Sequence, residues 1–473
     1  MCYWFEKART AIGSDGLSAA GLVATNSIRG GANRKVLDTI CASIRIYEAW
    51  SDEEWVNDGA AVRVSLVAFG KASQPARLDG VELTAISSDL HGKGSLTEVR
   101  KLLNNADVSF IGTQKNGPFD VPRELAVQWL GFPNPNGKSN ALVVRPWANG
   151  LDVTRRPQNR WVVDFGCAMP LDQAALFEAP FAYVDRRVKP TRMNVRRDWH
   201  RTHWWLYGDA RPGLRESLAT LGRFVVTPMV AKHRVFAWMP AVQIPENLCV
   251  AITRADDTTF GILHSRFHEL WSLRMCTWLG VGNDPRYTPT TCFETFPFPL
   301  GLTPADTAHQ LTELLEGGAL IPADLPTSSA PATDTQAGSA CKQTASQIAI
   351  AAKRLNDLRE AWLNPAEWTH RVPEVVPLGM STSPYPDRIE PRAGLNEGDL
   401  KALQKRTLTN LYNQRPAWLA MAHTQLDTAV AAAYGWSDYT PAMADEEILK
   451  RLLALNLERP TVHGPASVLP SMP

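Results

Sequence analysis

The first 71 residues alternate between helical and strand-like hydrophobic spacing, and this alternation limits the possible fold more than any other feature of the chain. Helical spacing occurs at residues 2–12 and 34–44, and strand-like runs occur at 21–27, 44–50 and 61–71. The order helix, strand, helix, strand, strand is typical of the closing half of an open α/β sheet. About three strands do not complete a doubly wound domain, so we predict that residues 1–94 form only part of such a sheet.

The hydrophobic pattern changes after residue 94. Short strand-like runs broken by Pro, Gly and Asn turns occur at 140–147, 160–166, 222–230, 234–240 and 249–255. We therefore predict an α+β domain at residues 95–300. Pro, Ser, Thr and Ala dominate residues 322–345, so we expect 301–345 to be a linker that is partly disordered. Helical spacing returns in 346–473, which predicts a mostly α C-terminal region.

The composition is that of a globular protein, with 44% hydrophobic and 21% charged residues among 473. No run of about 18 apolar residues is present, which excludes an integral membrane protein built on helical spans. The N-terminus carries aromatic and charged residues where a signal peptide needs an apolar core. The seven cysteines are odd in number and form no C-x-x-C pair, so we expect reduced thiols and a cytoplasmic location.

Two motifs that resemble a phosphate-binding or metal site do not meet the requirements of those sites. Residues 131–139 resemble a phosphate-binding loop, but five residues separate the two glycines, and two prolines remove backbone N–H donors. We predict a turn there. His264 and His268 have the spacing of zinc ligands on a helix, yet Glu269 is not placed as in H-E-x-x-H, so we predict helix packing and no metal site. The nucleophile motif G-x-S-x-G does not occur.

Residues 181–234 contain the highest local charge of the chain. Twelve Lys or Arg stand against four Asp or Glu, a net of +8 in a chain whose total is +1. Tryptophans lie among these cations, as on nucleic-acid surfaces, where guanidinium groups bind phosphates or guanine edges. A solvated basic face over a tryptophan core is the alternative, and Trp204 and Trp205 fit either description. The predicted DNA-contacting residues are Arg186, Arg187, Lys189, Arg192, Arg196, Arg197, Arg201, Lys232 and Arg234.

A polar loop follows the first predicted strand. In open α/β sheets, ligands bind outside the carboxyl ends of the strands. We therefore predict that Asn26, Arg29 and Asn33 line the rim of a cleft, with Gly30 and Gly31 allowing close backbone approach. An ordinary connection between strand and helix explains the same residues equally well.

Many segments in a consistent order resemble the MmeI-like group of bacterial site-specific adenine-N6 DNA methyltransferases. They cover most of the chain and include CYWFEKAR at 2–9, GLVATNSIRGGANRKVLD at 21–38, VRVSLVAFGK at 62–71, RPWANGLDVTRRPQNRWVVDFG at 145–166, THWWLYGDARP at 202–212, FVVTPMVAKHRVFAW at 224–238, GILHSRFHELWSL at 261–273, FPFPLGL at 296–302, LDTAVAAAYGW at 426–436 and EEILKRLLALNLER at 446–459. This resemblance implies that 1–94 is the second half of a Rossmann-like methyltransferase domain and that 95–300 is a DNA target-recognition domain.

The resemblance also implies S-adenosylmethionine as cofactor and a target adenine that is flipped out of the duplex. The family's glycine-rich cofactor turn does not occur before residue 21. Its Asn-Pro-Pro-Tyr/Phe motif is also missing, because Asn134-Pro135 and Asn364-Pro365 are followed by other residues. We therefore expect Met1 to lie just downstream of the catalytic motif. No residue can be assigned a catalytic role.

From the resemblance we expect part of an adenine-N6 methyltransferase of a restriction-modification or defence system, inactive as this chain alone. The expected partners are double-stranded DNA and a subunit or upstream segment that carries the missing motifs. One alternative is a non-catalytic DNA-binding specificity module for a separate subunit. A second alternative is a fragment of a restriction-modification polypeptide whose nuclease lies upstream.

Overall fold

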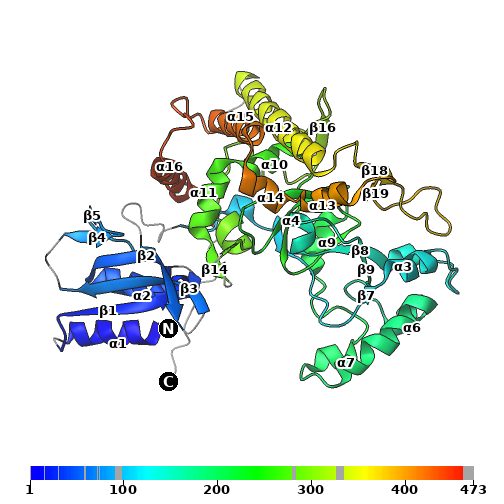
Figure 1. Ribbon diagram of the computed structural model, residues 1–473, viewed down its shortest axis with the longest axis horizontal. Helices are drawn as coiled ribbons and strands as arrows, with labels where there is room; N and C mark the ends of the chain where they lie inside the picture. Colours follow the sequence, from blue (N-terminus) through cyan, green and yellow to red (C-terminus); the bar gives the residue numbers. More distant parts are fainter. Residues whose placement is uncertain are drawn as a thin grey trace.

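A computed structural model describes most of the chain. The described residues are 2–90 apart from 15, 30, 58–59, 72 and 74, followed by 99–279, 284–325 and 335–461. Figure 1 shows the N-terminal sheet at one end of the long axis and helices α6 and α7 near the other, with the main body between them. Among the described residues no helix is both long and apolar enough to cross a membrane.

The N-terminal part is a mixed α/β unit. Its sheet has the order β1-β3-β2-β4-β5, and β3 runs antiparallel to both β1 and β2. The strands are β1 (Ala19–Thr25), β2 (Arg45–Asn57), β3 (Ala60–Gly70), β4 (Ala76–Leu78) and β5 (Val81–Leu83), and the helices are α1 (Cys2–Gly13), η1 (Asn26–Arg29) and α2 (Gly31–Ser43). The predicted helix and strand order is confirmed, and the short hairpin β4–β5 adds two strands that the sequence pattern did not predict.

Apolar side chains of α1 and α2 explain why both helices pack on this sheet. Phe5 and Ile12 of α1 share one buried cluster with Leu37 and Ile40 of α2 and with Phe69 of β3. The rings of Phe5 and Phe69 stack with their centroids 5.9 Å apart. Because these residues recur at helical spacing, they lie on one face of each helix, and that face packs against the sheet.

Two four-stranded sheets form the next part of the chain. The first has the order β11-β10-β13-β6, and the second has the order β12-β8-β9-β7. The strands are β6 (Ser109–Ile111), β7 (Asp120–Val121), β8 (Val144–Ala148), β9 (Arg160–Val163), β10 (Arg223–Pro228), β11 (Ala237–Pro240), β12 (Ile244–Pro245) and β13 (Cys249–Ile252). All five strand-like runs predicted from the sequence between 140 and 255 overlap one of these strands.

Helices surround these two sheets. They are α3 (Arg123–Leu130), α4 (Gly150–Thr154), α5 (Leu171–Ala175), α6 (Glu178–Arg187), α7 (Lys189–Met193), α8 (Asp198–Thr202), α9 (Pro212–Leu218), α10 (Asp257–His264) and α11 (Arg266–Met275). A small pair, β14 (Thr277–Leu279) and β15 (Asp284–Arg286), follows α11. The prediction of strands mixed with helices in this region is confirmed.

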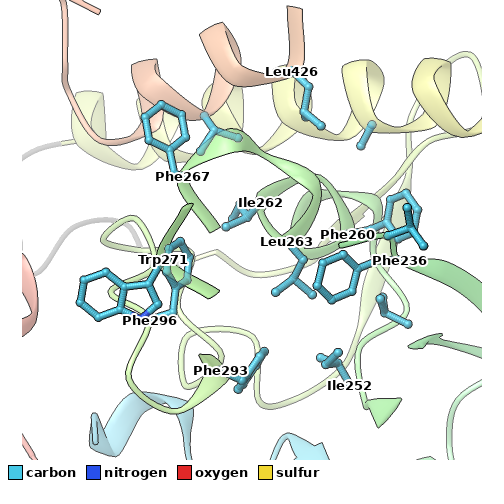
Figure 2. Packing of buried hydrophobic residues seen from close by; sticks show 14 of the residues in the cluster. Phe236, Ile252, Phe260, Ile262, Leu263, Phe267, Trp271, Phe293, Phe296 and Leu426 are labelled. Atoms are coloured by element: carbon cyan, nitrogen blue, oxygen red, sulfur yellow. The ribbon is translucent and has the colours of Figure 1, made fainter. Parts of the chain in front are cut away.

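The C-terminal helices complete the largest core of the molecule. They are α12 (Thr335–Leu363), α13 (Glu397–Lys405), α14 (Leu408–Gln414), α15 (Ala417–Ala433) and α16 (Asp445–Glu458), with a hairpin of β18 (Thr369–Val372) and β19 (Arg388–Pro391) between α12 and α13. Figure 2 shows Leu426 of α15 above Ile262 of α10, with Trp271 and Phe296 deeper in the same cluster. The helical region therefore shares one hydrophobic core with residues 224–300.

The expected linker contains regular structure. A hairpin of β16 (Thr312–Leu314) and β17 (Leu320–Pro322) lies within it, and helix α12 begins at Thr335. Buried Ala345 belongs to that helix and packs in the main core. Alanine is the best helix former, so an Ala-rich segment that borders a core becomes helical despite its linker-like composition. The expectation of a linker was wrong for 335–345, and residues 326–334 lie outside the described part.

Candidate nucleic-acid interface

Residues 178–203 form a projection that we call the basic arm. It consists of α6, α7 and α8 and lies at the lower right of Figure 1. Tyr183 and Val184 of α6 and Val188 after it are buried in a cluster with the second sheet. The hydroxyl of Tyr183 donates to the carbonyl of Asp120 over 2.7 Å. These contacts anchor one face of α6, while its last turn ends in Arg186 and Arg187, as the helix dipole favours.

Six of the predicted cations lie on the surface of the basic arm. They are Arg186, Arg187, Lys189, Arg196, Arg197 and Arg201, all exposed or partly exposed. Two of the six form ion pairs with carboxylates of the arm. Lys189 pairs with Asp185 over 2.7 Å, and Arg201 pairs with Asp198 over 2.7 Å. The arm thus keeps a positive surface that polyanions can reach.

Arg192 does not belong to this surface, so its prediction as a DNA contact was wrong. Its residue surface is 1% exposed. Nε donates to the carbonyl of Asn116 over 3.0 Å, and Nη2 donates to that of Lys115 over 2.6 Å. Burial lowers the pKa of Arg192 to about 10, which still leaves the guanidinium charged near neutrality. Its role is to hold α7 against the segment that precedes β7.

Lys232 and Arg234 lie between β10 and β11, away from the arm. Lys232 is exposed, whereas Arg234 is buried and donates to Thr227 Oγ1, to the carbonyl of Pro228 and to that of Pro285. Because Arg234 is buried and donates to three acceptors within the protein, it has a structural role. Its prediction as a DNA contact was also wrong. The sequence could not distinguish it from the exposed arginines, because its partner Pro285 is 51 residues away.

The tryptophans of the basic segment divide into two groups. Trp204 and Trp205, just after the arm, are buried in the cluster shared with the second sheet, and Trp205 Nε1 donates to the carbonyl of Met169 over 2.8 Å. Trp199 instead lies on the surface. The core alternative is therefore confirmed for Trp204 and Trp205 but does not describe Trp199.

The prediction that the loop after β1 lines a cleft rim is contradicted for Asn26. Asn26 is buried, accepts from Ser65 Oγ over 2.9 Å and donates to Asp52 Oδ1. Asn33 accepts from the thiol of Cys2 on α1. Burial lowers the pKa of Arg29, and the carboxylates of Asp52, Asp79 and Asp89 oppose that shift. Gly30 lies outside the described residues.

This geometry bears directly on the cofactor. Asn26, the residue predicted to face a ligand at the end of β1, uses both ends of its amide within the sheet. It therefore does not fit as a group that binds S-adenosylmethionine. No step of methyl transfer can be derived from the described residues.

A cleft that the sequence did not predict lies between the second sheet and the C-terminal helices. Its volume is about 310 Å³, and the arginines that line it are Arg155, Arg156, Arg359, Arg388 and Arg406. Most are already bound: Arg156 donates to the carbonyl of Leu363, and Arg406 donates to that of Trp362. The Arg156 bond joins the segment between β8 and β9 to α12, and the Arg406 bond joins the end of α13 to α12. Residues spread over some 250 positions leave no local motif from which such a cleft could be recognised.

The weaker motifs have structural roles. His264 Nε2 accepts from the backbone N–H of Phe236, and His268 Nε2 bonds the hydroxyl of Tyr287 over 2.9 Å. Both rings are buried in the main core, as predicted for helix packing. Among the described residues no group of three potential metal ligands occurs. Residues 131–139 form the predicted turn, in which Asn134 Nδ2 donates to the carbonyl of Lys138.

Comparison with known proteins agrees with this architecture. Residues 224–300 match the family model described as MmeI, target recognition domain, and this segment contains β10 to β15 with α10 and α11. The basic arm lies outside the matched segment. No curated protein matches the chain.

One solved structure covers nearly all of the chain. It is that of the type IIL restriction-modification enzyme MmeI in complex with DNA, with a TM-score of 0.65 and 16% sequence identity. The match covers 96% of this chain and 52% of MmeI, so the chain spans about half the length of that enzyme. The matched recognition domain and the shared fold together support an MmeI-like protein.

Proposed function

We propose that this chain binds duplex DNA through the basic arm and supplies target recognition to an MmeI-like restriction-modification enzyme. The observation that carries the proposal is the group of six solvent-facing cations on the arm, which adjoins a region that matches a target recognition domain. Guanidinium and ammonium groups bind phosphates, and each phosphate contact releases a counterion. The DNA named in the description of the MmeI structure supports the same partner.

The complete enzyme, in this proposal, methylates adenine N6 with S-adenosylmethionine. The chain alone has no such activity, because neither the glycine-rich turn nor the Asn-Pro-Pro-Tyr/Phe motif occurs in its sequence. Methyl transfer to mixed-sequence duplex DNA by the purified chain would refute this part of the proposal.

The edge of the N-terminal sheet favours the addition of a further strand from the segment or subunit that carries the missing motifs. Among the described strands, β1 pairs only with β3, and its sequence AAGLVAT contains no charge. Val23 on this strand and Tyr3 and Trp4 on α1 are exposed. An uncharged edge strand with exposed apolar neighbours is suited to accept a further strand. We expect a co-expressed polypeptide that carries both missing motifs to co-purify with the chain, and Val23→Lys to prevent it.

The binding proposal is tested with the double variant Arg196→Ala, Arg197→Ala. Two lost phosphate contacts are expected to weaken duplex binding and to reduce the slope of log K against log salt by about 1.8. Lys401→Ala, Lys450→Ala removes the same charge from exposed positions on α13 and α16 and serves as the matched control. Unchanged affinity and slope in the arm variant would overturn the assignment of the interface.

A further inference from the structure

Trp199 is an exposed indole on a surface that otherwise consists mainly of cations. The residue is 43% exposed, although Trp204 and Trp205 only a few positions later are buried. It lies in α8, a single turn at the end of the basic arm. Isolated exposed aromatic residues are common on proteins, so exposure alone does not indicate a function. The residues that surround Trp199 do indicate one.

The ring of Trp199 is supported from within the arm. It stacks on His203 with the centroids 4.9 Å apart and the planes at 14°. His203 in turn lies against Trp205, with a centroid distance of 5.6 Å. Trp205 is fixed in the core by its bond to Met169. Three rings thus lead from the core to the surface, and we call this series the aromatic ladder.

Hydrogen bonds hold the inner part of the aromatic ladder in place. Thr202 Oγ1 lies 3.0 Å from His203 Nδ1 and donates to the carbonyl of Asp198 over 3.1 Å. Arg201 Nη1 donates to the carbonyl of Val195 over 2.9 Å, which fixes the turn before α8. An aromatic ring that is already held in position loses little conformational entropy when a ligand stacks on it.

Cations lie directly beside Trp199 in the chain. Arg196 and Arg197 precede α8, and both are exposed. Proteins that hold unstacked bases combine cations for the backbone with aromatic rings for the bases. The aromatic ladder and these two arginines reproduce that combination within residues 196–205.

We propose that Trp199 stacks on a base of the bound DNA while Arg196 and Arg197 hold the adjacent phosphates. This inference rests on the proposed function, since it requires DNA on the basic arm. Every base has a π-face, so the contact adds affinity without requiring a particular sequence. It needs a base that is at least partly unstacked from its neighbours, which makes the arm a place where the duplex is locally opened or kinked.

Fluorescence anisotropy with a labelled mixed-sequence duplex and the full chain tests the inference. Trp199→Ala is expected to weaken binding about 5- to 100-fold, as for loss of one base–aromatic stack. The salt slope stays unchanged, because no charge is lost. Trp199→Phe retains a ring and is expected to recover most of the affinity. Trp55→Ala removes an indole that is also 43% exposed, on β2, and serves as the control.

Tryptophan emission gives a second measurement that does not depend on affinity. Stacking on a base quenches indole emission, so saturating duplex is expected to quench the wild-type chain more than Trp199→Phe. Equal quenching together with wild-type affinity of Trp199→Ala would overturn the inference. If the Arg196→Ala, Arg197→Ala variant is weakened in that case, the proposed function stands. If that variant also binds normally, or the wild-type chain binds no duplex, both proposals fail.

Discussion

Arg192 donates from Nε to the carbonyl oxygen of Asn116 over 3.0 Å, at the centre of the most basic segment of the chain. A second bond runs from Nη2 to the carbonyl of Lys115. The two bonds join α7 to the segment before β7. Arg192 therefore stabilises the fold, although its sequence position resembles that of a DNA-contacting residue.

Arg192→Met is expected to destabilise the chain by about 1–3 kcal/mol, because the carbonyl groups of Lys115 and Asn116 lose their bonds to a buried guanidinium. Arg187→Ala on the exposed face of α6 is expected to change stability by less than about 0.5 kcal/mol. Chemical denaturation of both variants measures the difference. A stable Arg192→Met variant whose DNA affinity has a reduced salt slope would instead place Arg192 on the phosphate backbone.

How far the sequence predicts this surface is illustrated by Arg192 and Arg196. Both occur in the same basic segment, yet one is buried and the other exposed, because the acceptors of Arg192 lie 76 and 77 residues earlier in the chain. Local composition therefore predicts that a basic surface exists but not which of its members face solvent. The same limit applies to Asn26, whose partners Asp52 and Ser65 come from later strands.

The secondary structure was more predictable than the site. Strand β13 is a continuous run of four buried apolar residues, and β10 contains three in a row, a pattern that can be recognised in the sequence. The early start of α12 at Thr335 was not predictable from composition, because small residues are common to linkers and to closely packed helices. Contact between α12 and α10, which is far away in the sequence, stabilises the helical conformation of this segment.

Gly261→Ala tests how closely α10 packs in the main core. A Cβ at Gly261 would lie 2.7 Å from Ile348 Cγ2 and 2.9 Å from Ala352 Cβ, both on α12. Overpacking of this kind is expected to cost about 1–3 kcal/mol of stability. Gly13→Ala in α1 meets no atom within 4 Å, so it is expected to be neutral or stabilising. Thermal unfolding of the two variants distinguishes them, and equal melting temperatures would contradict the packing of α10 on α12.

His268 makes the stability depend on pH. Burial, with a smaller effect from Arg234, lowers the pKa of His268 to about 3 from an ordinary 6.5. The unfolded chain therefore binds more protons between these values, and stability falls as the pH falls from 6.5 toward 3. His268→Gln retains a partner for Tyr287 and does not titrate. Its loss of stability from pH 6.5 to 4.5 is expected to be smaller than that of the wild-type chain by about 2–3 kcal/mol. Parallel pH profiles would contradict a buried neutral histidine.

Asp427 on α15 is expected to act in the opposite direction. Burial raises the pKa of Asp427 to about 7, although the backbone N–H of Arg266 donates to it over 2.8 Å. The folded chain holds this proton between pH 3.8 and 7, so its contribution to stability falls as the pH rises through that range. Asp427→Asn keeps the acceptor and is expected to gain about 3–4 kcal/mol relative to the wild-type chain between pH 4 and 7. A constant difference at all pH values would show that Asp427 is ionised in the fold.

The most direct test of the proposed DNA interface is to locate the residues that contact bound DNA. Photo-crosslinking to a duplex with a reactive backbone group, followed by mass spectrometry, identifies the contacted peptides. We predict cross-links in the peptides that contain Arg186, Arg187, Arg196, Arg197 and Trp199, with loss of those around α8 in the Arg196→Ala, Arg197→Ala variant. Cross-links confined to the cleft beside Arg155 and Arg156, with none in residues 178–203, would contradict the basic arm as the DNA interface.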